Sequence, residues 1–454
     1  MSAMLLDKPM YKLPPLRFWR TLIPAAALLI TIGLLSKFNY PLPDYTSILL
    51  WYSRLDPLLL LSFLRNGEIP GWLWLPLAML LATLLAGRVF CGWLCPLGGL
   101  LALLGSVRSR PIPAWVDRLK PFRVPWLLFL LALMAWGSGW TLYLSPFHLL
   151  TEELNRIWLG QIPWLLLAVV FSGLVIFPRF WCVYLCPTGL LFSIVSRWRL
   201  LRAKPPQGCI HCGRCEKICP TGAADPAASQ TTADCLLCGR CSEKCPVDLF
   251  DFVNHRSGNP ALAAGDVGFT RREVLRSGTA LLVAGAAAPL LMKPTAANPL
   301  RPPGALEEAE FLSRCSRCGR CMRVCPSKCI RPMPFSSGPA MFLTPYIIAR
   351  EARCELTQYC QQVCPTGAIG HLPVEKTLMG LAEIDHSRCL GWSQGKLCLL
   401  CQEQCPRHAI ESPDKIRPQV IADLCVGCGA CENGCPVDSP AAIVVKPQPS
   451  RSRK

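Results

Sequence analysis

The sequence predicts an α-helical membrane domain joined to small α+β modules that are built around clusters of cysteine. Three observations lead to this fold class. The 454 residues include 28 cysteines, the hydrophobic fraction is 52% and the mean hydropathy is +0.33. An ordinary soluble domain is less apolar than this, so part of the chain is expected to lie in lipid. The cysteines recur in short runs with fixed spacing, which is typical of metal-binding modules.

Four apolar runs in the N-terminal part of the chain are expected to be membrane helices. They cover residues 21–36, 71–87, 125–144 and 162–178. Each approaches the length that crosses about 30 Å of hydrocarbon. Residues 46–64 are also apolar but contain Arg54, Asp56 and Pro57, which predicts an interfacial or re-entrant segment. The membrane domain is therefore assigned to residues 1–204.

The basic residues indicate how this domain is oriented. Lys and Arg concentrate before the first apolar run, between the second and third, and after the fourth. By the positive-inside rule, both ends of the domain are expected to face the cytoplasm. This placement accounts for the net charge of +18 as flanks of membrane helices, so no nucleic-acid partner is expected.

A short motif occurs twice in the membrane domain, each time directly after an apolar run. Residues 88–98 (RVFCGWLCPLG) return as residues 179–189 (RFWCVYLCPTG), with Arg, both Cys, Pro and Gly in register. Both copies are expected at the cytoplasmic surface, with each Cys pair on one helix face because of its i,i+4 spacing. Two interpretations stay open for Cys91, Cys95, Cys182 and Cys186. They bind one further cluster together, or they are packing residues or a structural thiol pair.

Four runs of the form Cys-x-x-Cys-Gly-x-Cys-x-x-x-Cys-Pro begin at Cys209, Cys235, Cys315 and Cys425. Such a run supplies three thiolates to one iron–sulfur cluster and a fourth to its neighbour. The Gly permits a positive φ, and the Pro, which lacks an N–H, directs the chain away from the cluster. Zinc sites usually separate their Cys pairs by a longer spacer. The runs therefore predict α+β ferredoxin-like iron–sulfur modules.

Residues 205–250 hold two complete runs and are expected to form a two-cluster module in the cytoplasm. Crossed pairing of the runs gives two ligand sets. One set is Cys209, Cys212, Cys215 and Cys245, and the other is Cys235, Cys238, Cys241 and Cys219.

Residues 251–299 are expected to be a linker that carries a twin-arginine export signal or a fifth membrane helix. Arg271 and Arg272 precede an apolar run at 277–292, in a pattern typical of the signal. An ordinary fifth helix with a basic flank is the alternative. Both interpretations place the following module outside. Export after folding would let clusters form before the thiols meet an oxidising compartment.

Residues 300–446 are expected to hold four clusters, ahead of a basic tail at 447–454. The ligands fall into two complete runs, one run with a stretched first gap and one incomplete run: Cys315, Cys318, Cys321, Cys325; Cys425, Cys428, Cys431, Cys435; Cys389, Cys398, Cys401, Cys405; and Cys354, Cys360, Cys364. Thr357 stands where the incomplete run would have its middle Cys, so this cluster is either [3Fe-4S] or completed by the spare Cys329. The outer runs are expected to pair with each other, and the inner runs likewise. The whole chain should bind about six [4Fe-4S] clusters.

These features resemble two known families. Residues 1–250 resemble the NapH type of quinol dehydrogenase membrane subunit, with four helices, two Cys-x-x-x-Cys-Pro motifs and a two-cluster ferredoxin. Residues 265–445 resemble the MauM/NapG ferredoxin-type family, with its twin-arginine leader and four Cys runs. The resemblance implies a multi-pass protein of the bacterial inner membrane. It would oxidise quinol from the quinone pool and pass electrons to a periplasmic acceptor, such as a multihaem cytochrome or a reductase.

Quinol oxidation must release protons to a base. His148, Glu152 and Glu153 lie between the third and fourth apolar runs and are candidates for this role near the outer interface, with a hydrated polar loop as the alternative. His148 is the only histidine of the membrane domain, and the chain has no Cys-x-x-Cys-His, so haem is not expected. The alternative function is a maturation factor for a respiratory metalloenzyme, since a related family with similar motifs assists oxidase assembly.

Overall fold

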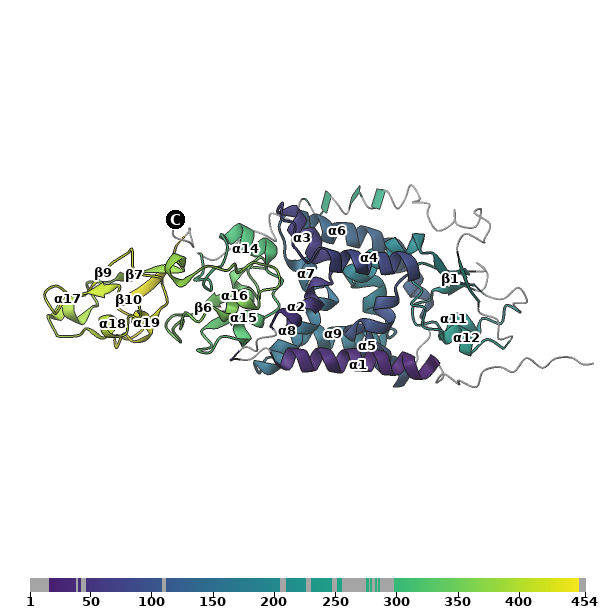
Figure 1. The fold of residues 1–454 in the computed structure, drawn as a ribbon, viewed down its shortest axis with the longest axis horizontal. Helices are drawn as coiled ribbons and strands as arrows, with labels where there is room; N and C mark the ends of the chain where they lie inside the picture. The colour runs from purple at the N-terminus through teal and green to yellow at the C-terminus, as the bar shows by residue number, and fades with distance from the viewer. Residues whose placement is uncertain are drawn as a thin grey trace, which may run out of the picture.

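The chain forms an elongated molecule in which a helical bundle separates two cysteine-rich modules (Figure 1). The computed structural model describes residues 16–37, 40–41, 46–107, 112–204, 210–225, 230–246, 251–254, 275–276, 278–279, 282–283, 285 and 298–448. Cys209, the twin arginines and most of the 277–292 run lie outside the described residues, as does most of the basic tail. The module after the bundle and the C-terminal module lie at opposite ends of the bundle (Figure 1).

The bundle consists of helices of unequal length. They are α1 (Leu16–Ser36), α2 (Thr46–Arg54), α3 (Pro57–Arg65), α4 (Trp74–Ala86), α5 (Pro96–Val107), α6 (Arg123–Ala135), α7 (Trp140–Tyr143), α8 (Pro146–Trp158), α9 (Trp164–Val175) and α10 (Pro187–Val195). The predicted run 125–144 is divided into α6 and α7, because Gly137 adopts φ +98° between them. The predicted 46–64 segment is divided at Asp56, whose carboxylate accepts the Leu58 N–H and begins α3.

Among the described residues, Phe18–Ser36 of α1 is the one stretch that is both long and apolar enough to cross a membrane alone. The segments Trp74–Ala86, Pro96–Gly105 and Trp164–Val175 are apolar but shorter. At about 1.5 Å per residue, a 13-residue helix such as α4 spans roughly 20 Å, less than the hydrocarbon thickness. Helix length therefore supports one full crossing, and a four-helix membrane domain is not confirmed by it.

The two copies of the repeated motif form matching halves of the bundle. Each copy is a π-helical turn, Phe90–Leu94 or Trp181–Leu185, that leads into α5 or α10. Arg179 donates to the Cys91 carbonyl at 2.7 Å, and Arg88 donates to the Cys182 carbonyl at 2.7 Å. Each arginine thus holds the motif of the other copy. The helices that flank the two copies also pack across them. Helix α4, before the first copy, packs against α10, after the second, and α5 packs against α9.

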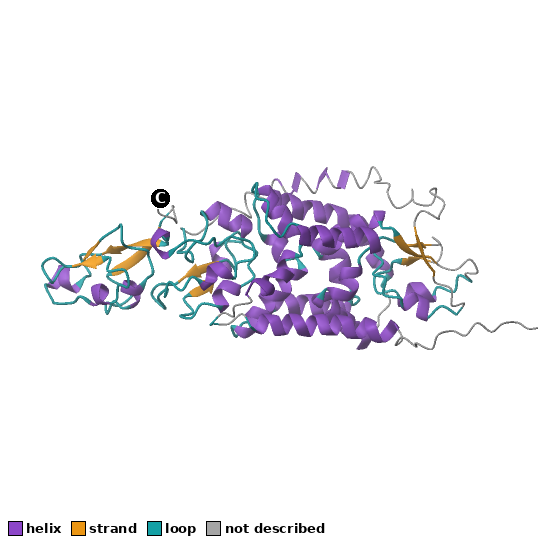
Figure 2. Cartoon of the chain, in the orientation of Figure 1, coloured by secondary structure: helices purple, strands orange, loops and turns teal. Residues whose placement is uncertain are grey.

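Strands of the described chain occur in the two end modules (Figure 2). In the module after the bundle, β1 (Leu201–Lys204) pairs with β4 (Asp251–Asn254), and β2 (Ala224–Asp225) pairs with β3 (Gln230–Thr231), beside the short helices α11 (Arg214–Ile218) and α12 (Arg240–Glu243). These two pairings and the three within the C-terminal module are all antiparallel. Both modules therefore have the small α+β architecture that the cysteine runs predict.

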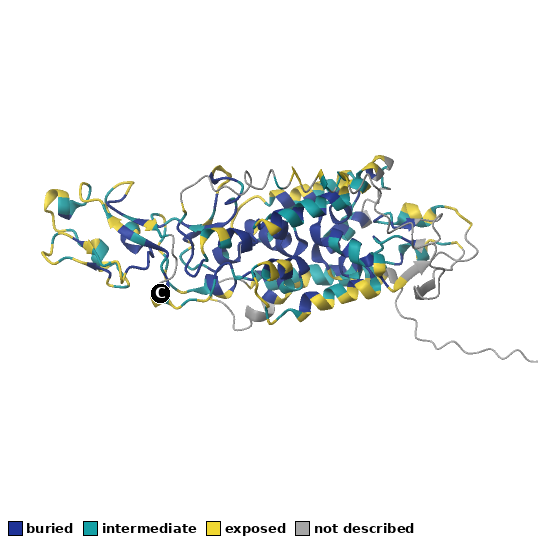
Figure 3. Ribbon diagram, turned by 90° about the horizontal axis from the view of Figure 1, so that it is seen from above, coloured by how far each residue is buried: buried dark blue, intermediate teal, exposed yellow. Residues whose placement is uncertain are grey.

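The C-terminal module consists of two units in a row. The unit next to the bundle contains α14 (Glu308–Arg314), α15 (Arg320–Arg323), α16 (Tyr359–Gln362) and the hairpin of β5 (Ile330–Pro332) and β6 (Pro345–Ile347). The distal unit contains α17 (Leu390–Gln394), α18 (Leu400–Glu403), α19 (Ala430–Asn433), the pair β7 (Gly380–Ile384) with β10 (Ile443–Pro447), and the pair β8 (Ile410–Glu411) with β9 (Gln419–Val420). Buried residues concentrate along the bundle axis and at its junction with the first unit (Figure 3).

Candidate metal centres and the cavity beside them

The local backbone of each cysteine run matches its sequence. The glycine after the second Cys has a positive φ in all four complete runs, from +69° at Gly213 to +81° at Gly429. This glycine begins a short helix that carries the third Cys, and the chain leaves it at the Cys-Pro step. The prediction that these glycines turn the chain through the left-handed region is confirmed.

The crossed exchange of thiols is visible in three of the ligand sets. Cys219 lies around one small void with Cys235, Cys238 and Cys241. Cys364 lies in the same way with Cys315, Cys318 and Cys321, and Cys435 with Cys389, Cys398 and Cys401. Cys405 acts electrostatically on Cys428 and Cys431. In each case the last Cys of one run joins the first three of its partner, as in two-cluster ferredoxins.

The predicted pairing of outer with outer and inner with inner runs is wrong. Helix α15 packs on α16, and α18 packs on α19, so consecutive runs share clusters. The β5–β6 hairpin lies between the first two runs, and β5 packs on α15. The two units are joined where the Cys354 N–H donates to the Cys428 carbonyl at 2.8 Å. The clusters of the C-terminal module would therefore form one series that leads away from the bundle.

Among the described residues, no group of three or more His, Cys, Asp or Glu side chains is gathered closely enough to hold a single metal ion. A cubane cluster spreads its thiolates farther apart, because each thiolate binds a different iron atom. The described cysteines are also free of disulfides. Three of the sets above place four thiols around one small void, which fits the geometry of a multi-iron cluster.

The first run of the C-terminal module is seated directly on the bundle. Asn155 of α8 donates to the Cys318 carbonyl at 2.6 Å, and Arg320 donates to the Ser53 hydroxyl at 2.7 Å. At the margin, Arg314 forms two hydrogen bonds of 2.8 Å with Glu68. The first cluster of the C-terminal module would thus lie against the end of the bundle and not on a flexible tether.

The second run of the other module is seated on the opposite end. The Asp234 carboxylate, next to Cys235, accepts from Arg88 at 2.7 Å and from Arg123 at 2.6 Å. Burial by itself would raise the pKa of Asp234, but the guanidiniums of Arg123 and Arg88 outweigh it and hold this pKa well below its usual range. Sequence reasoning missed Asp234, because nothing local distinguishes it from a surface residue of a cysteine run.

The four motif cysteines are all buried in one apolar cluster of the bundle. Cys91, Cys95, Cys182 and Cys186 are between 4% and 8% exposed and share this cluster with Phe147 of α8 and Leu236 of the cysteine module. The expectation that each pair lies on one α-helical face is wrong, because the π-helical turn ends before the second Cys. They are not at an open surface either, since the docked module covers them.

His148, Glu152 and Glu153 belong to helix α8 and are 0%, 3% and 0% exposed. The alternative of a hydrated polar loop is therefore wrong. Glu153 is fully engaged, because it accepts from Tyr143 and from the Leu165 and Leu166 N–H groups. Within the described chain, both ring nitrogens of His148 and Oε2 of Glu152 have no hydrogen-bond partner. Tyr52 Oη, also buried nearby in this cluster of helices, is unpartnered as well.

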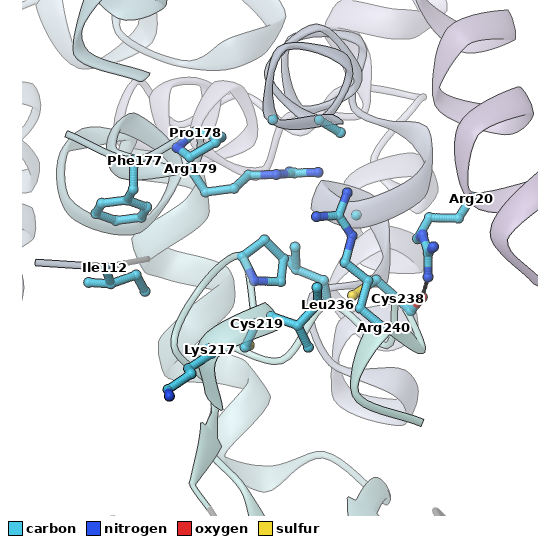
Figure 4. A pocket seen from close by; sticks show the side chains of 15 residues that line it. Arg20, Ile112, Phe177, Pro178, Arg179, Lys217, Cys219, Leu236, Cys238 and Arg240 are labelled. Atoms are coloured by element: carbon cyan, nitrogen blue, oxygen red, sulfur yellow. Dashed lines mark hydrogen bonds between the residues drawn. The ribbon is translucent and has the colours of Figure 1, made fainter. Parts of the chain in front are cut away.

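A cavity of about 380 Å³ opens between the bundle and the cysteine module, which is within the size range of small-molecule sites. Its wall is mostly apolar and includes Ala102, Phe177 and Leu236, while Cys219 and Cys238 of one ligand set also line it. The basic side chains at the cavity are Arg20, Arg179, Lys217 and Arg240. Figure 4 shows Arg179 and Arg240 extending toward the same space, with Arg20 bonded to the Cys238 carbonyl at 3.2 Å.

Comparison with known proteins agrees with this cysteine chemistry. Models described as 4Fe-4S binding domains match residues 69–114, 159–206, 206–225 and 418–440, and a 4Fe-4S dicluster domain matches residues 314–368. The ferredoxin-type protein NapG of Escherichia coli strain K12 is 35% identical over 193 residues, which cover 38% of this chain and 83% of the relative. The methylamine utilization ferredoxin-type protein MauM of Methylorubrum extorquens is 36% identical over 166 residues, covering 34% of this chain and 74% of the relative. No solved structure is significantly similar to the chain.

Proposed function

Because this chain belongs to the family of ferredoxin-type iron–sulfur proteins that includes NapG and MauM, we propose that it carries electrons from membrane quinol to an acceptor in the periplasm. That it is an iron–sulfur electron-transfer protein follows from its 4Fe-4S domains and its relatives. The quinol, the membrane path and the acceptor are our proposal. It unites a NapH-like bundle with a NapG-like module in one chain, and the two 4Fe-4S matches at 69–114 and 159–206 that cover the bundle repeats support this union.

The cavity beside Cys219 and Cys238 is the observation that carries the proposal. A quinol ring needs an apolar cavity at the edge of the membrane, next to a cluster that takes one electron at a time. The apolar wall suits the ring, and the guanidiniums of Arg179 and Arg240 could donate to its oxygens and stabilise the anion left by the first deprotonation. Each oxidised quinol releases two protons and two electrons, and both electrons pass singly to clusters.

The route of the electrons follows the packing of the bundle. Leu236 of the cysteine module lies in the same apolar cluster as the four motif thiols. The Phe147 ring of that cluster stacks on the Phe90 ring, with 5.1 Å between the ring centroids, and its centroid lies 4.9 Å from that of Tyr52. Arg320 of the first external run acts electrostatically on Tyr52. The motif cysteines thus lie between the two modules, where a further cofactor would divide a long electron transfer into shorter steps.

The outside of the bundle supports insertion in lipid. Leu29, Ile30, Leu81, Leu167 and Phe171 are large apolar side chains that are between 53% and 68% exposed. An exposed apolar belt of this kind indicates a membrane or partner surface. We propose that the bundle crosses the bacterial inner membrane several times, with residues 205–250 in the cytoplasm and 300–446 in the periplasm.

The described residues of the linker support a further crossing. Arg276 lies over the Phe122 ring at 5.3 Å, at the start of α6, and Gly285 lies beside Trp136, just after the end of α6. The described residues Arg276 and Gly285 therefore follow one another along α6 in the direction of that helix. Leu282 and Val283, which lie between them in sequence, are 75% and 59% exposed, as lipid-facing side chains would be.

Changing both Arg271 and Arg272 to Lys tests whether this segment is a twin-arginine signal. Lys keeps the charge but lacks the forked guanidinium donors. We expect the double variant to leave the C-terminal module inside while the bundle stays in the membrane. Reporter fusions after residue 446 measure the side. Arg301 is buried and is therefore unsuitable as a control position. The control is Arg276→Lys, which makes the same change of residue type but retains both twin arginines. Normal export of the double variant would make residues 277–292 a simple fifth helix.

Arg240→Gln tests the cavity, and the repeat provides a matched control. Arg214 occupies the same position in the preceding run but is exposed and does not line the cavity. We expect Arg240→Gln to slow reduction of the clusters by a quinol analogue at least about tenfold, because one charged donor to the substrate contributes roughly 1.5–3 kcal/mol. Arg214→Gln should react normally. Reduction by dithionite reports whether the clusters are intact, and equal quinol rates for both variants would exclude the cavity.

The pair His148 and Glu152 marks the alternative position for quinol, at the opposite end of the bundle. If the substrate binds there, Glu152→Gln and not Arg240→Gln is the variant that fails in the same assay. The same measurement also separates electron transfer from the alternative function of a maturation factor. A maturation factor need not show rapid reduction of its clusters by quinol in purified form, whereas the proposed function requires it.

A further inference from the structure

The second run of the C-terminal module lacks one of its cluster ligands. Thr357 follows Leu356, whose φ is +57°, just as Cys318 follows Arg317, whose φ is +58°. Thr357 therefore stands at the backbone position of a ligand but offers no thiol, and it is exposed to solvent. Since Cys364 already lies with Cys315, Cys318 and Cys321, the second cluster is left with Cys325, Cys354 and Cys360.

Cys329 is the thiol nearest to this incomplete set. It is 2% exposed, and its Sγ lies 3.5 Å from Sγ of Cys325. Cys354 influences the Cys329 thiol electrostatically, and Cys360 is influenced in the same way by both Cys325 and Cys329. The four thiols therefore face one small volume of the first unit.

Other runs of the same chain show what Cys329 replaces. The residue four positions after the last Cys of a run is alanine in three other cases, Ala223, Ala368 and Ala409, each 1% exposed. The residue before it has a positive φ in every case, including +54° at Lys328 and +67° at Gly222. The Ala223 and Ala409 N–H groups donate to the sulfur of the last Cys at 3.2 Å, and the Cys329 N–H bonds to Cys325 in the same way.

Cys329 compensates for the ligand that is lost at Thr357. The four turns have the same backbone, so a side chain at this position points at the cluster of its unit. Alanine fills the position where the paired run has all its ligands, for example at Ala223 beside the set of Cys219 and Cys235. Cysteine occupies it in the unit in which Thr357 has taken a ligand position. A random buried thiol would not be expected to coincide with the missing ligand in this way.

We propose that Cys329 is the fourth ligand of this cluster, so that Cys325, Cys329, Cys354 and Cys360 hold a complete [4Fe-4S] centre. A cubane needs one protein ligand for each iron, and three thiolates alone favour loss of the unliganded iron. With this fourth ligand the cluster is a four-iron and not a three-iron centre. The assignment requires that the cysteine runs bind clusters, but it requires neither quinol nor a particular side of the membrane.

The test is Cys329→Ala in the full chain, purified without oxygen. Alanine is the residue that this turn carries elsewhere in the chain, so the fold should tolerate it. We expect the variant to lose one iron per chain after mild oxidation and to gain the electron paramagnetic resonance signal of a [3Fe-4S] cluster, which the wild type lacks. Unchanged iron content without that signal would overturn the proposal.

A second variant keeps the test decisive if the first variant loses more than one iron. Adding Thr357→Cys to Cys329→Ala restores the thiol at the ordinary position of the run, where the backbone already has the required conformation. We expect this double variant to recover the iron and lose the three-iron signal. Failure to recover would mean that Cys329 acts through folding and not as a ligand, and a three-iron signal in the wild type would contradict the proposal directly.

Discussion

Replacing Cys95 with Ser is expected to abolish the passage of electrons from quinol to the clusters of the C-terminal module. Cys95 is buried in the apolar cluster that separates the two modules, and its sulfur accepts the Gly98 N–H at 3.4 Å. Cys186 repeats this contact with Gly189 at 3.3 Å. A hydroxyl keeps this hydrogen bond but is a poor ligand for iron or another soft metal. The hydrogen bond that shapes the turn should therefore remain, while the ability of residue 95 to bind a metal is lost.

The measurement is the rate at which visible absorbance bleaches after mixing with a quinol analogue. Full bleaching by dithionite should remain, because the runs that hold the other clusters are untouched. Val183→Ala is the matched control, since it removes buried volume inside the second motif without altering a thiol. Normal bleaching by quinol in the Cys95→Ser variant would mean that the four motif cysteines are packing residues and take no part in electron transfer.

Changing Asp234 to Asn is expected to detach the cysteine module that follows the bundle. Asp234 is the carboxylate that faces Arg88 and Arg123, and the Arg88 side chain is 0% exposed. Removing the one carboxylate leaves two buried or nearly buried guanidiniums facing each other, and breaking a buried pair in this way costs about 3–5 kcal/mol. Limited proteolysis between the bundle and residue 210, and the thermal melting temperature, should both report the loss.

A surface ion pair of the same module serves as the control. Glu243 pairs with Arg20 at 3.0 Å, with side chains 31% and 17% exposed, so Glu243→Gln should cost less than about 1 kcal/mol. Because the pKa of Asp234 is held below its usual range, the docking energy is present at neutral pH and is lost only as the pH falls below about 4, through the native pKa. Docking of the wild type that weakened between pH 8 and 6 would contradict this assignment.

The local features of this protein could be predicted from its sequence. The spacing of each cysteine run, its left-handed glycine and its Cys-Pro exit are formed by neighbouring residues, so they could be read directly, as could the two-cluster exchange around Cys219. The apolar runs that became α1, α4 and α9 were also recognisable, because apolar segments leave water wherever they lie in the chain. The repeat of the Arg-Cys-Cys-Pro motif was visible because the same residue types recur at the same spacing.

Which distant parts of the chain meet could not be predicted in this way, because it depends on long-range packing. The pairing of consecutive runs depends on the β5–β6 hairpin, and the position of Cys329 beside Cys354 depends on the turn before that hairpin. The burial of His148 and Glu152 was not foreseen, because their polar sequence is covered by the docked first unit and not by local chain. Asp234 can hold its module on the bundle only because the fold brings Arg88 and Arg123 to it across more than a hundred residues of sequence. Spacing governs what neighbours can bind, whereas long-range packing governs which of those groups share one site.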